Sequence, residues 1–255
     1  GNRSFDENVP EETNRRIVDH ISDINMPYSE NARLYLMREG IHPGTIFVTG
    51  TPMTEVLTYY AKKIDSSKVL SEMKLSKGKY FVASIHREEN VESGESLKKL
   101  VETLEAVAEK YKMPIIMSLH PRTKARLEKY KLKLPKLVRA LKPMGYFDYN
   151  KLQKNAFCVL SDSGSIHEET AILKMPAVQM RVSQERPEAF DEGVAILSGI
   201  EKDAVISSIE VVTAHAREGK KFNIPKSYQD TNFSAKVVRL ITGYAGIVKK
   251  RRALN

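Results

Sequence analysis

The apolar residues of this chain fall into short runs that are separated by longer amphipathic stretches. Runs such as YFVASI, PIIMSL, AFCVLS and PAVQM have the length and composition of buried strands. The stretches between them, at about 96–110 and in SIHEETAIL, place apolar residues three or four positions apart, as helices do. Strands that alternate with helices at this spacing predict an α/β fold, in which helices cover a parallel sheet.

Helices are also predicted near both ends of the chain. PEETNRRIVDHISD starts with Pro10, which suits the first turn of a helix, and SENARLYLMREG has Ser29 as an N-cap and Gly40 as a stop. The run IFVTG predicts a further strand. Helices at about 53–73, 201–218 and 232–248 complete the prediction.

A polar, lysine-rich stretch at 61–78 marks a change of composition before the main alternation of strands and helices. We place a domain boundary near it. Only one or two strands are predicted before this stretch, too few for a sheet, so we expect the chain to open in the middle of a domain. The expected division is 1–60, 61–225 and 226–255.

The composition is that of a soluble globular protein, with 41% apolar and 29% charged residues. The longest apolar runs, at 113–117 and 156–160, are far shorter than the ~20 residues that span a bilayer, so no membrane span is expected. The opening GNRSFDENVPEE lacks the layout of a signal peptide, which indicates a cytoplasmic protein. The single cysteine, Cys158, lies in an apolar strand and is expected to be a small buried hydrophobe.

The net charge of +9 raises the question of nucleic-acid binding. The lysines are spread through amphipathic helices and are not interleaved with aromatic residues, and the chain has no tryptophan. A solvated basic surface is therefore the favoured interpretation, and no nucleic-acid partner is expected. Binding to DNA or RNA stays as an alternative that rests on charge alone.

Polar side chains follow the predicted strands at the point where each strand ends. His86 and Arg87 follow YFVAS, His120 and Arg122 follow PIIMS, and SDSGSIHEE follows CVL. Because ligands of open α/β sheets bind beyond the carboxyl ends of the strands, these clusters are candidates for one common site. Taken singly, each histidine also fits a core or surface position, and Arg87 with its neighbouring glutamates fits a surface ion pair.

The segment SDSGS has the features of a phosphate-binding turn between a strand and a helix. Backbone N–H groups and the helix dipole attract anions there, Gly164 allows close approach, and Ser163 adds a hydroxyl donor. Glu168 or Glu169 could accept hydrogen bonds from ribose hydroxyls. Plain helix capping is the alternative for this segment. The patterns GXGXXG, GXXXXGK[ST] and GXSXG do not occur, and no Cys or His spacing predicts a metal site.

The motifs SIHREEN, LHP, SDSGSIHEE and ERPEAFDEG, which follow GNRSFDENVPEETNRRIVDHISD and IFVTGTPMTEVL, resemble those of the non-hydrolysing UDP-N-acetylglucosamine 2-epimerases. The resemblance runs from Gly1 to about Ala245. The segments GNRSFDENVPEE and SDSGSIHEE are more similar to the motifs of one branch of this family. Enzymes of that branch make UDP-N-acetyl-L-fucosamine from its talosamine isomer for capsule and O-antigen polysaccharide. The family resemblance implies Rossmann-like domains in the glycosyltransferase-B arrangement, usually a homodimer, and neither a metal nor another cofactor.

The resemblance also implies the reaction and the role of each part of the chain. The C2 proton of a UDP-sugar leaves with anti elimination of UDP, and re-addition of UDP to the glycal inverts C2. Residues 61–225 correspond to the UDP-binding domain and 1–60 to a remnant of the N-terminal domain. Residues 226–255 correspond to a C-terminal helix that returns to that domain.

Site residues follow from the same motifs. By resemblance, Glu11 and Arg15 lie at the catalytic cleft, and His86 lies near the diphosphate, where it would stabilise the departing UDP oxygen. His120 corresponds to a histidine that binds a regulatory UDP-sugar in some members. The segment KPMGYFDYNKL suggests that Tyr146 or Phe147 lies near the uracil. The substrate-binding set implied is Arg87, Tyr146, Phe147, Ser163, Gly164, Glu169 and Arg186.

This sequence differs from the family pattern at its N-terminal end. In the family, a Gly-Thr-Arg-Pro-Glu loop, a Gly-Asp-Thr segment and a His-x-Glu-Ala segment precede the position of Gly1, and they complete the active site. We therefore expect a truncated form that binds UDP and turns over slowly or not at all. Two other classes fit the same motifs: a glycosyltransferase of the same architecture, and a catalytically dead module that binds nucleotide-sugars.

Overall fold

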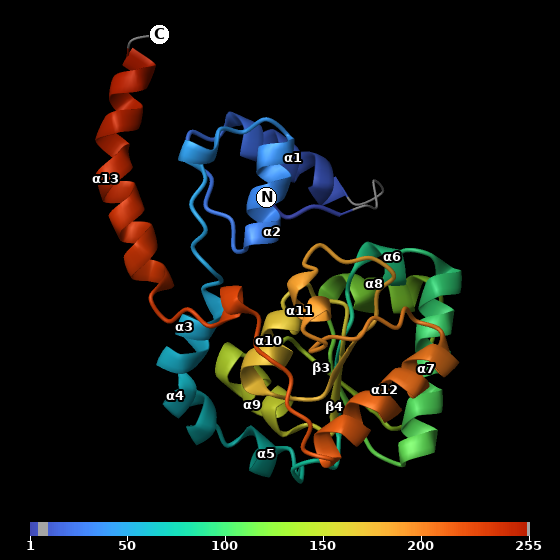
Figure 1. Ribbon diagram of the computed structural model, residues 1–255. Helices are drawn as coiled ribbons and strands as arrows, with labels where there is room; N and C mark the ends of the chain where they lie inside the picture. Colours follow the sequence, from blue (N-terminus) through green and yellow to red (C-terminus); the bar gives the residue numbers. More distant parts are fainter. Residues whose placement is uncertain (5–9, 254–255) are drawn as a thin grey trace. The chain divides into compact units, whose positions relative to one another are not determined.

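The computed structural model describes residues 1–4 and 10–253, and the chain divides into two compact units (Figure 1). The first unit comprises 1–59, 183–191 and 224–255, and the second comprises 60–182 and 192–223. The boundary between Tyr59 and Tyr60 lies at the start of the lysine-rich stretch where the composition changes. No helix in the described part of the chain is both long enough and apolar enough to cross a membrane.

The second unit is built on a five-stranded parallel sheet with the order β3-β2-β1-β4-β5. This confirms the predicted α/β fold. The central strand β1 pairs with β2 on one side and with β4 on the other, where Ser84 is in register with Ser161. The strands are β1 (Phe81–Ser84), β2 (Ile115–Ser118), β3 (Val138–Leu141), β4 (Cys158–Ser161) and β5 (Ala177–Gln179).

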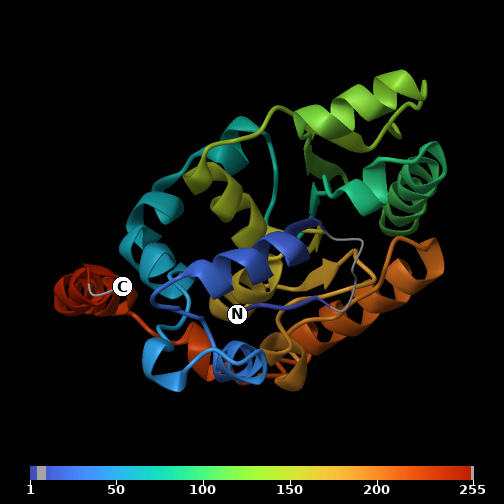
Figure 2. The ribbon, with the colours of Figure 1, turned by 90° about the horizontal axis from the view of Figure 1, so that it is seen from above.

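Helices cover both faces of this sheet because alternate strand residues point to opposite sides. Phe81 and Ala83 pack with the apolar faces of α7 (Gly94–Tyr111) and α12 (Lys202–Arg217), whereas Val82 packs with α9 (Tyr146–Asn155) and α10 (Ile166–Leu173). Figure 1 shows α9 and α10 on one side of the sheet and α12 and α7 on the other, and Figure 2 shows α7 and α12 side by side. Cys158 is fully buried in the core, as predicted.

Some predicted elements differ from the structure in extent, and some elements of the structure were not predicted. The single helix expected at 53–73 is three helices: it breaks at Tyr60, where the two units divide, and at Ser67, whose backbone is extended and whose hydroxyl donates to Asp148 of α9 (2.6 Å). The strand expected in IFVTG is reduced to an isolated bridge between Asn25 and Ile46. The unpredicted elements include β3, α8 (Pro121–Lys129) and α9. The three helices are α3 (Met53–Tyr59), α4 (Ala61–Ser66) and α5 (Val69–Glu72).

The first unit consists of helices and loops in its described residues. Ser29 caps α2 (Glu30–Arg38), with its Oγ accepting from the N–H of Ala32 (3.2 Å), as predicted. The ring of Tyr244 in α13 (Phe233–Ala253) lies 4.9 Å from that of Phe47. The other elements are α1 (Pro10–Ile21), η1 (Pro43–Thr45), α11 (Glu188–Asp191) and η2 (Lys226–Tyr228), and the second unit also has α6 (Glu88–Val91).

Candidate functional site

The loop after β1 is held by a carboxylate that follows β4. Asp162 is fully buried, and its Oδ2 accepts hydrogen bonds from the backbone N–H groups of His86 (2.9 Å) and Arg87 (2.8 Å). The side-chain amide of Asn90 donates to the same oxygen (3.1 Å) and to the carbonyl of Met180 after β5 (2.9 Å). Three donors therefore satisfy a buried charge, and they fix the HREEN loop across three neighbouring strands.

The histidines that follow β1 and β2 are in contact. The rings of His86 and His120 are stacked, with centroids 5.3 Å apart, and Nδ1 of His86 lies 3.5 Å from Oδ1 of Asp162. Burial lowers the pKa of His86; the Asp162 carboxylate opposes this, and the charges of His120, Arg87 and Arg122 lower the pKa further. The neutral imidazole is thus favoured in a position where it can still gain a proton near an anion.

The two glutamates of the HREEN loop pair with residues of other strand ends. Glu88 lies 3.1 Å from the guanidinium of Arg122, and both side chains are exposed. Glu89 accepts a hydrogen bond from Nε of Arg181 (3.0 Å), a fully buried side chain that follows β5. The loop is therefore tied to the ends of β2, β4 and β5, whereas the alternative interpretation from sequence was a local surface ion pair of Arg87 with its neighbouring glutamates.

The serine-rich turn after β4 satisfies much of its own hydrogen bonding. The N–H of Ser163 donates to Ser161 Oγ (3.1 Å), the N–H of Ser165 donates to Ser163 Oγ (3.3 Å), and the hydroxyls of Ser163 and Ser165 lie 3.0 Å apart. The bond from the N–H of Ser165 is longer than the usual ~2.7–3.2 Å, so an anion could replace its hydroxyl acceptor at little cost. The turn leads directly into α10, in agreement with the predicted strand, turn and helix.

Glu169 projects from the first turn of α10, and both of its carboxylate oxygens have protein donors. Ser165 Oγ donates to Oε1 (2.8 Å), and the amide of Gln153 in α9 donates to Oε2 (2.7 Å). Tyr149, also in α9, makes a side-chain hydrogen bond with Ser84, and burial with the nearby Glu169 and Asp162 charges raises the pKa of its phenol. Tyr149 and Gln153 were missed because only the strand order shows that α9 lies beside this turn.

Aromatic side chains form a cluster at the start of α9. The ring of Phe147 lies 5.2 Å from that of Tyr60 and 5.9 Å from that of Tyr146, and the ammonium of Lys63 lies over Tyr60 and Phe147. Burial, Glu169 and Tyr60 raise the pKa of Tyr146. Tyr146 keeps 41% of its surface exposed, which leaves a ring face available for stacking.

The first unit contributes a second group of charged side chains. Glu11 of α1 is exposed, whereas Glu12 is buried and accepts from the N–H of Ser4 (2.8 Å) and from Nε of Arg16 (2.9 Å). Arg15 lies 3.7 Å from Glu12 and 3.7 Å from Glu185, and its buried Nη1 has no hydrogen-bond partner among the described residues. This nitrogen therefore has a donor to offer a ligand.

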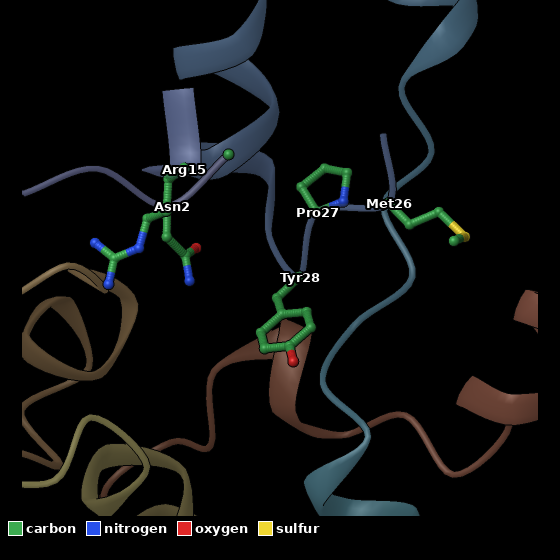
Figure 3. Close-up of a pocket in the computed structure, with 6 residues that line it drawn as sticks. Asn2, Arg15, Met26, Pro27 and Tyr28 are labelled. Carbon is green, nitrogen blue, oxygen red and sulfur yellow. The ribbon is translucent and has the colours of Figure 1, made fainter. Parts of the chain in front are cut away.

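The ERPEA segment lies against the start of α2 in the same unit. The guanidinium of Arg186 lies over the ring of Tyr28 at 5.4 Å, and Ser29 Oγ donates to Glu188. A pocket of about 190 Å³ is lined by Gly1, Asn2, Arg15, Met26, Pro27 and Tyr28. It is smaller than the ~300–1,000 Å³ of typical ligand sites, so it would hold only part of a ligand. Figure 3 shows the side chains that line it, among them those of Arg15, Asn2 and Tyr28.

The structure thus brings the predicted site residues into two groups, one in each unit. The second unit holds the strand-end group, and the first unit holds Glu11, Arg15 and Arg186. Within the described residues, no three His, Cys, Asp or Glu side chains are arranged to hold a metal ion. The strand-end group consists of His86, Arg87, His120, Tyr146, Phe147, Ser163, Gly164 and Glu169, and the unpredicted members are Asp162, Tyr149, Gln153 and Arg181.

Comparison with known proteins identifies the family. The model of the UDP-N-acetylglucosamine 2-epimerase family matches residues 1–242. This chain belongs to that family of epimerases. The structure of UDP-N-acetylglucosamine 2-epimerase from Rickettsia bellii is 38% identical and superimposes with a TM-score of 0.90, covering 100% of this chain and 68% of that one.

Other relatives of this epimerase family differ in the sugars they are named for. The Methanocaldococcus jannaschii UDP-GlcNAc 2-epimerase, solved in complex with UDP-GlcNAc and UDP, is 36% identical with a TM-score of 0.87, covering 95% of this chain and 67% of that one. A Pseudomonas aeruginosa UDP-2,3-diacetamido-2,3-dideoxy-D-glucuronate 2-epimerase is 31% identical over 82% of this chain and 57% of its own length. The chain spans about two thirds of the length of the UDP-GlcNAc 2-epimerases.

Proposed function

We propose that this chain is the UDP-binding part of a UDP-N-acetylhexosamine 2-epimerase. The observation that carries the proposal is the cluster at the ends of β1, β2 and β4, in a chain that belongs to this family. A stacked histidine pair, a serine-rich turn at a helix start and a carboxylate in the first turn of that helix suit a nucleoside diphosphate. The relative solved with UDP-GlcNAc and UDP supports the same ligand class.

In the proposed reaction, the enzyme removes the C2 proton and the bond from C1 to the UDP oxygen breaks on the opposite face. This gives a glycal and free UDP, and re-addition with protonation from the other face inverts C2. His86 would donate a hydrogen bond or proton to the departing diphosphate oxygen, where negative charge develops. Ser163, Gly164 and Arg87 would hold the phosphates, and Glu169 would hold the ribose.

The proposed acid or base belongs to the charged group of the first unit. Arg15 has a buried nitrogen that lies 3.7 Å from Glu12 and has no hydrogen-bond partner among the described residues, and Arg186 is held against Tyr28. Of the adjacent carboxylates, Glu11 has the exposure that contact with a substrate needs, while Glu12 has the fixed geometry of a residue that orients Arg15. Glu11 is therefore the proposed acid or base of the pair.

The proposed substrate is a 6-deoxy UDP-sugar of the talosamine and fucosamine series. The reaction would take place in the cytoplasm, and its product would be used to build surface polysaccharide. The support is the sequence of the segments GNRSFDENVPEE and SDSGSIHEE. The P. aeruginosa relative is named for yet another UDP-sugar, so the names of the relatives do not all give the same substrate. We also propose a homodimer, which light scattering would test. His120 would give a second calorimetric binding step if a regulatory UDP-sugar binds there.

Calorimetric titration with UDP tests the nucleotide site. We expect the chain to bind UDP and Glu169→Ala to bind it more weakly, because the ribose hydroxyls lose their acceptor. Glu102→Ala serves as the control, since Glu102 is an exposed residue of α7 whose partner is Lys98. Equal affinity in the wild type and both variants would contradict the assignment of Glu169.

A second experiment tests turnover by measuring deuterium incorporation at C2 in heavy water. We propose that this chain alone turns over slowly or not at all, because it spans about two thirds of the length of its relatives. Rapid C2 exchange would contradict that part of the proposal and would support the reaction. Sugar transfer to an added acceptor would favour the glycosyltransferase alternative.

A further inference from the structure

Asp162 is a buried carboxylate that joins the two motifs of the strand-end site. It directly follows β4, and its own N–H continues the ladder to the carbonyl of Ser84 in β1 (3.2 Å). Its side chain then reaches the loop after β1, where it accepts from the N–H groups of His86 and Arg87 and from Asn90. The residue has no exposed surface, and its carboxylate contacts the loop that carries His86.

The two oxygens of Asp162 share the N–H of His86 and differ in their other partners. Oδ2 accepts three bonds, from His86 N, Arg87 N and Asn90 Nδ2, at 2.8 to 3.1 Å. Oδ1 lies 3.1 Å from His86 N and 3.5 Å from Nδ1 of the His86 ring. Oδ2 therefore makes most of the bonds that position the loop, and Oδ1 places negative charge beside the imidazole.

We propose that Asp162 is a positioning residue that fixes the His86 loop and controls, through its negative charge, the proton occupancy of the His86 imidazole. The consequence for catalysis rests on the proposed function, whereas the effect on His86 does not. The groups that face His86 are Asp162 after β4, His120 and Arg122 after β2, and Arg87 beside it in its own loop. Asp162 is the only anion in this set, so it alone favours the protonated ring.

Asp162→Asn removes the charge and keeps most of the bonds to the loop. An asparagine with its carbonyl oxygen in place of Oδ2 keeps the three bonds to that oxygen, whereas its amide replaces Oδ1, removes the charge and gives up the second, longer bond from the His86 N–H. Histidine titration by NMR on the full chain would measure the midpoint for His86, assigned by comparison with His86→Gln. We expect the midpoint to fall by about one pH unit in Asp162→Asn, as the loss of a close opposite charge requires. Asp203→Asn, at an exposed position of α12, is the control.

An unchanged His86 midpoint in Asp162→Asn would overturn the proposal. Amide hydrogen exchange in the wild type tests the positioning role without any variant: the N–H groups of His86 and Arg87 should exchange slowly, because a buried acceptor holds them. Exchange as fast as that of the amides in the exposed 219–222 loop would also overturn it.

The link to function is tested by the pH dependence of UDP affinity. Because protonated His86 attracts the diphosphate, the midpoint of this dependence should move down by the same amount, about one pH unit, in Asp162→Asn. A UDP midpoint that stays fixed while the His86 midpoint moves would overturn the functional consequence. Absence of UDP binding in the wild type would instead contradict the proposed function and leave the NMR result as the test of this inference.

Discussion

The amide Nε2 of Gln153 lies 2.7 Å from Oε2 of Glu169, and Gln153 exposes only 1% of its surface. Ser165 Oγ lies 2.8 Å from the other oxygen of the same carboxylate. Glu169 is therefore held from two elements, α9 and the turn before α10, and its orientation is set before a ligand arrives. Such orientation lowers the entropy cost of ligand binding.

Removal of the Gln153 amide should weaken UDP binding. We expect Gln153→Ala to lower the affinity by about tenfold, because a hydrogen bond to a charged group contributes roughly 1.5–3 kcal/mol and part of that orientation is lost. Calorimetry measures the change. Asn155→Ala is the matched control on the same helix, since the Asn155 amide donates only within α9. Equal affinities for the wild type and Gln153→Ala would show that Glu169 does not depend on this bond.

The adjacent glutamates of the HREEN loop should differ in their effect on stability. Glu89→Gln removes the negative charge that pairs with the fully buried Arg181. We expect the free energy of unfolding to fall by about 2 kcal/mol. This is less than the ~3–5 kcal/mol lost when a fully buried pair is broken, because Glu89 is partly exposed. Glu88→Gln is the control: its pair with Arg122 is exposed and should contribute under ~1 kcal/mol. Urea unfolding monitored by circular dichroism measures both, and equal losses would contradict the difference.

Acid should remove a contribution of Glu39 to the stability of the first unit. Hydrogen bonds from Arg3 lower the pKa of Glu39 from the ordinary 4.5 to about 2. The contribution is present above pH 4.5 and is lost as the pH falls toward 2. We expect Glu39→Gln to be less stable than the wild type at pH 7, and this difference to shrink between pH 4.5 and 2.

Urea titrations across this pH range measure the difference for Glu39. Glu30→Gln, at an exposed position of α2, the helix that Glu39 caps, should follow the wild type throughout. A difference that stays constant with pH would rule out the Arg3 contact as its cause.

The thiol of Cys158 should be chemically silent in the folded protein. It is fully buried in β4, and burial raises its pKa well above the usual range. We expect thiol reagents to label Cys158 only after unfolding, so that the labelling rate follows the urea transition. Rapid labelling under native conditions would show that the sheet opens readily at β4.

The sequence predicts the strands that are buried on both faces and the long amphipathic helices, but not the partly exposed edge strand. Strands β1, β2, β4 and β5 are apolar runs, and each was located from that pattern. The edge strand β3 was missed because Arg139 and Ala140 are exposed, so its sequence has no clear periodicity. A strand was expected in IFVTG because its residues favour strands, but a strand needs a partner, and Ile46 pairs only with Asn25 among the described residues.

The candidate site was predictable in part, for a related reason. Residues that follow strands, such as His86 and His120, could be placed at one edge because all strands of a parallel sheet point the same way. The partners of these residues depend on which strands are neighbours, and the order β3-β2-β1-β4-β5 is not written in the local sequence. For this reason Asp162 and Arg181 were not predicted, although both follow strands.

The contacts of the HREEN loop also set the time at which the site can form during synthesis. The acceptor for His86 lies 76 residues further along the chain, and the partner of Glu89 lies 92 residues further along. A growing chain that has passed β1 and β2 therefore carries a loop without its anchors until β5 and Arg181 leave the ribosome. Ribosome-bound chains that stop before Asp162 should expose this loop to protease, and chains that extend well beyond Arg181 should protect it.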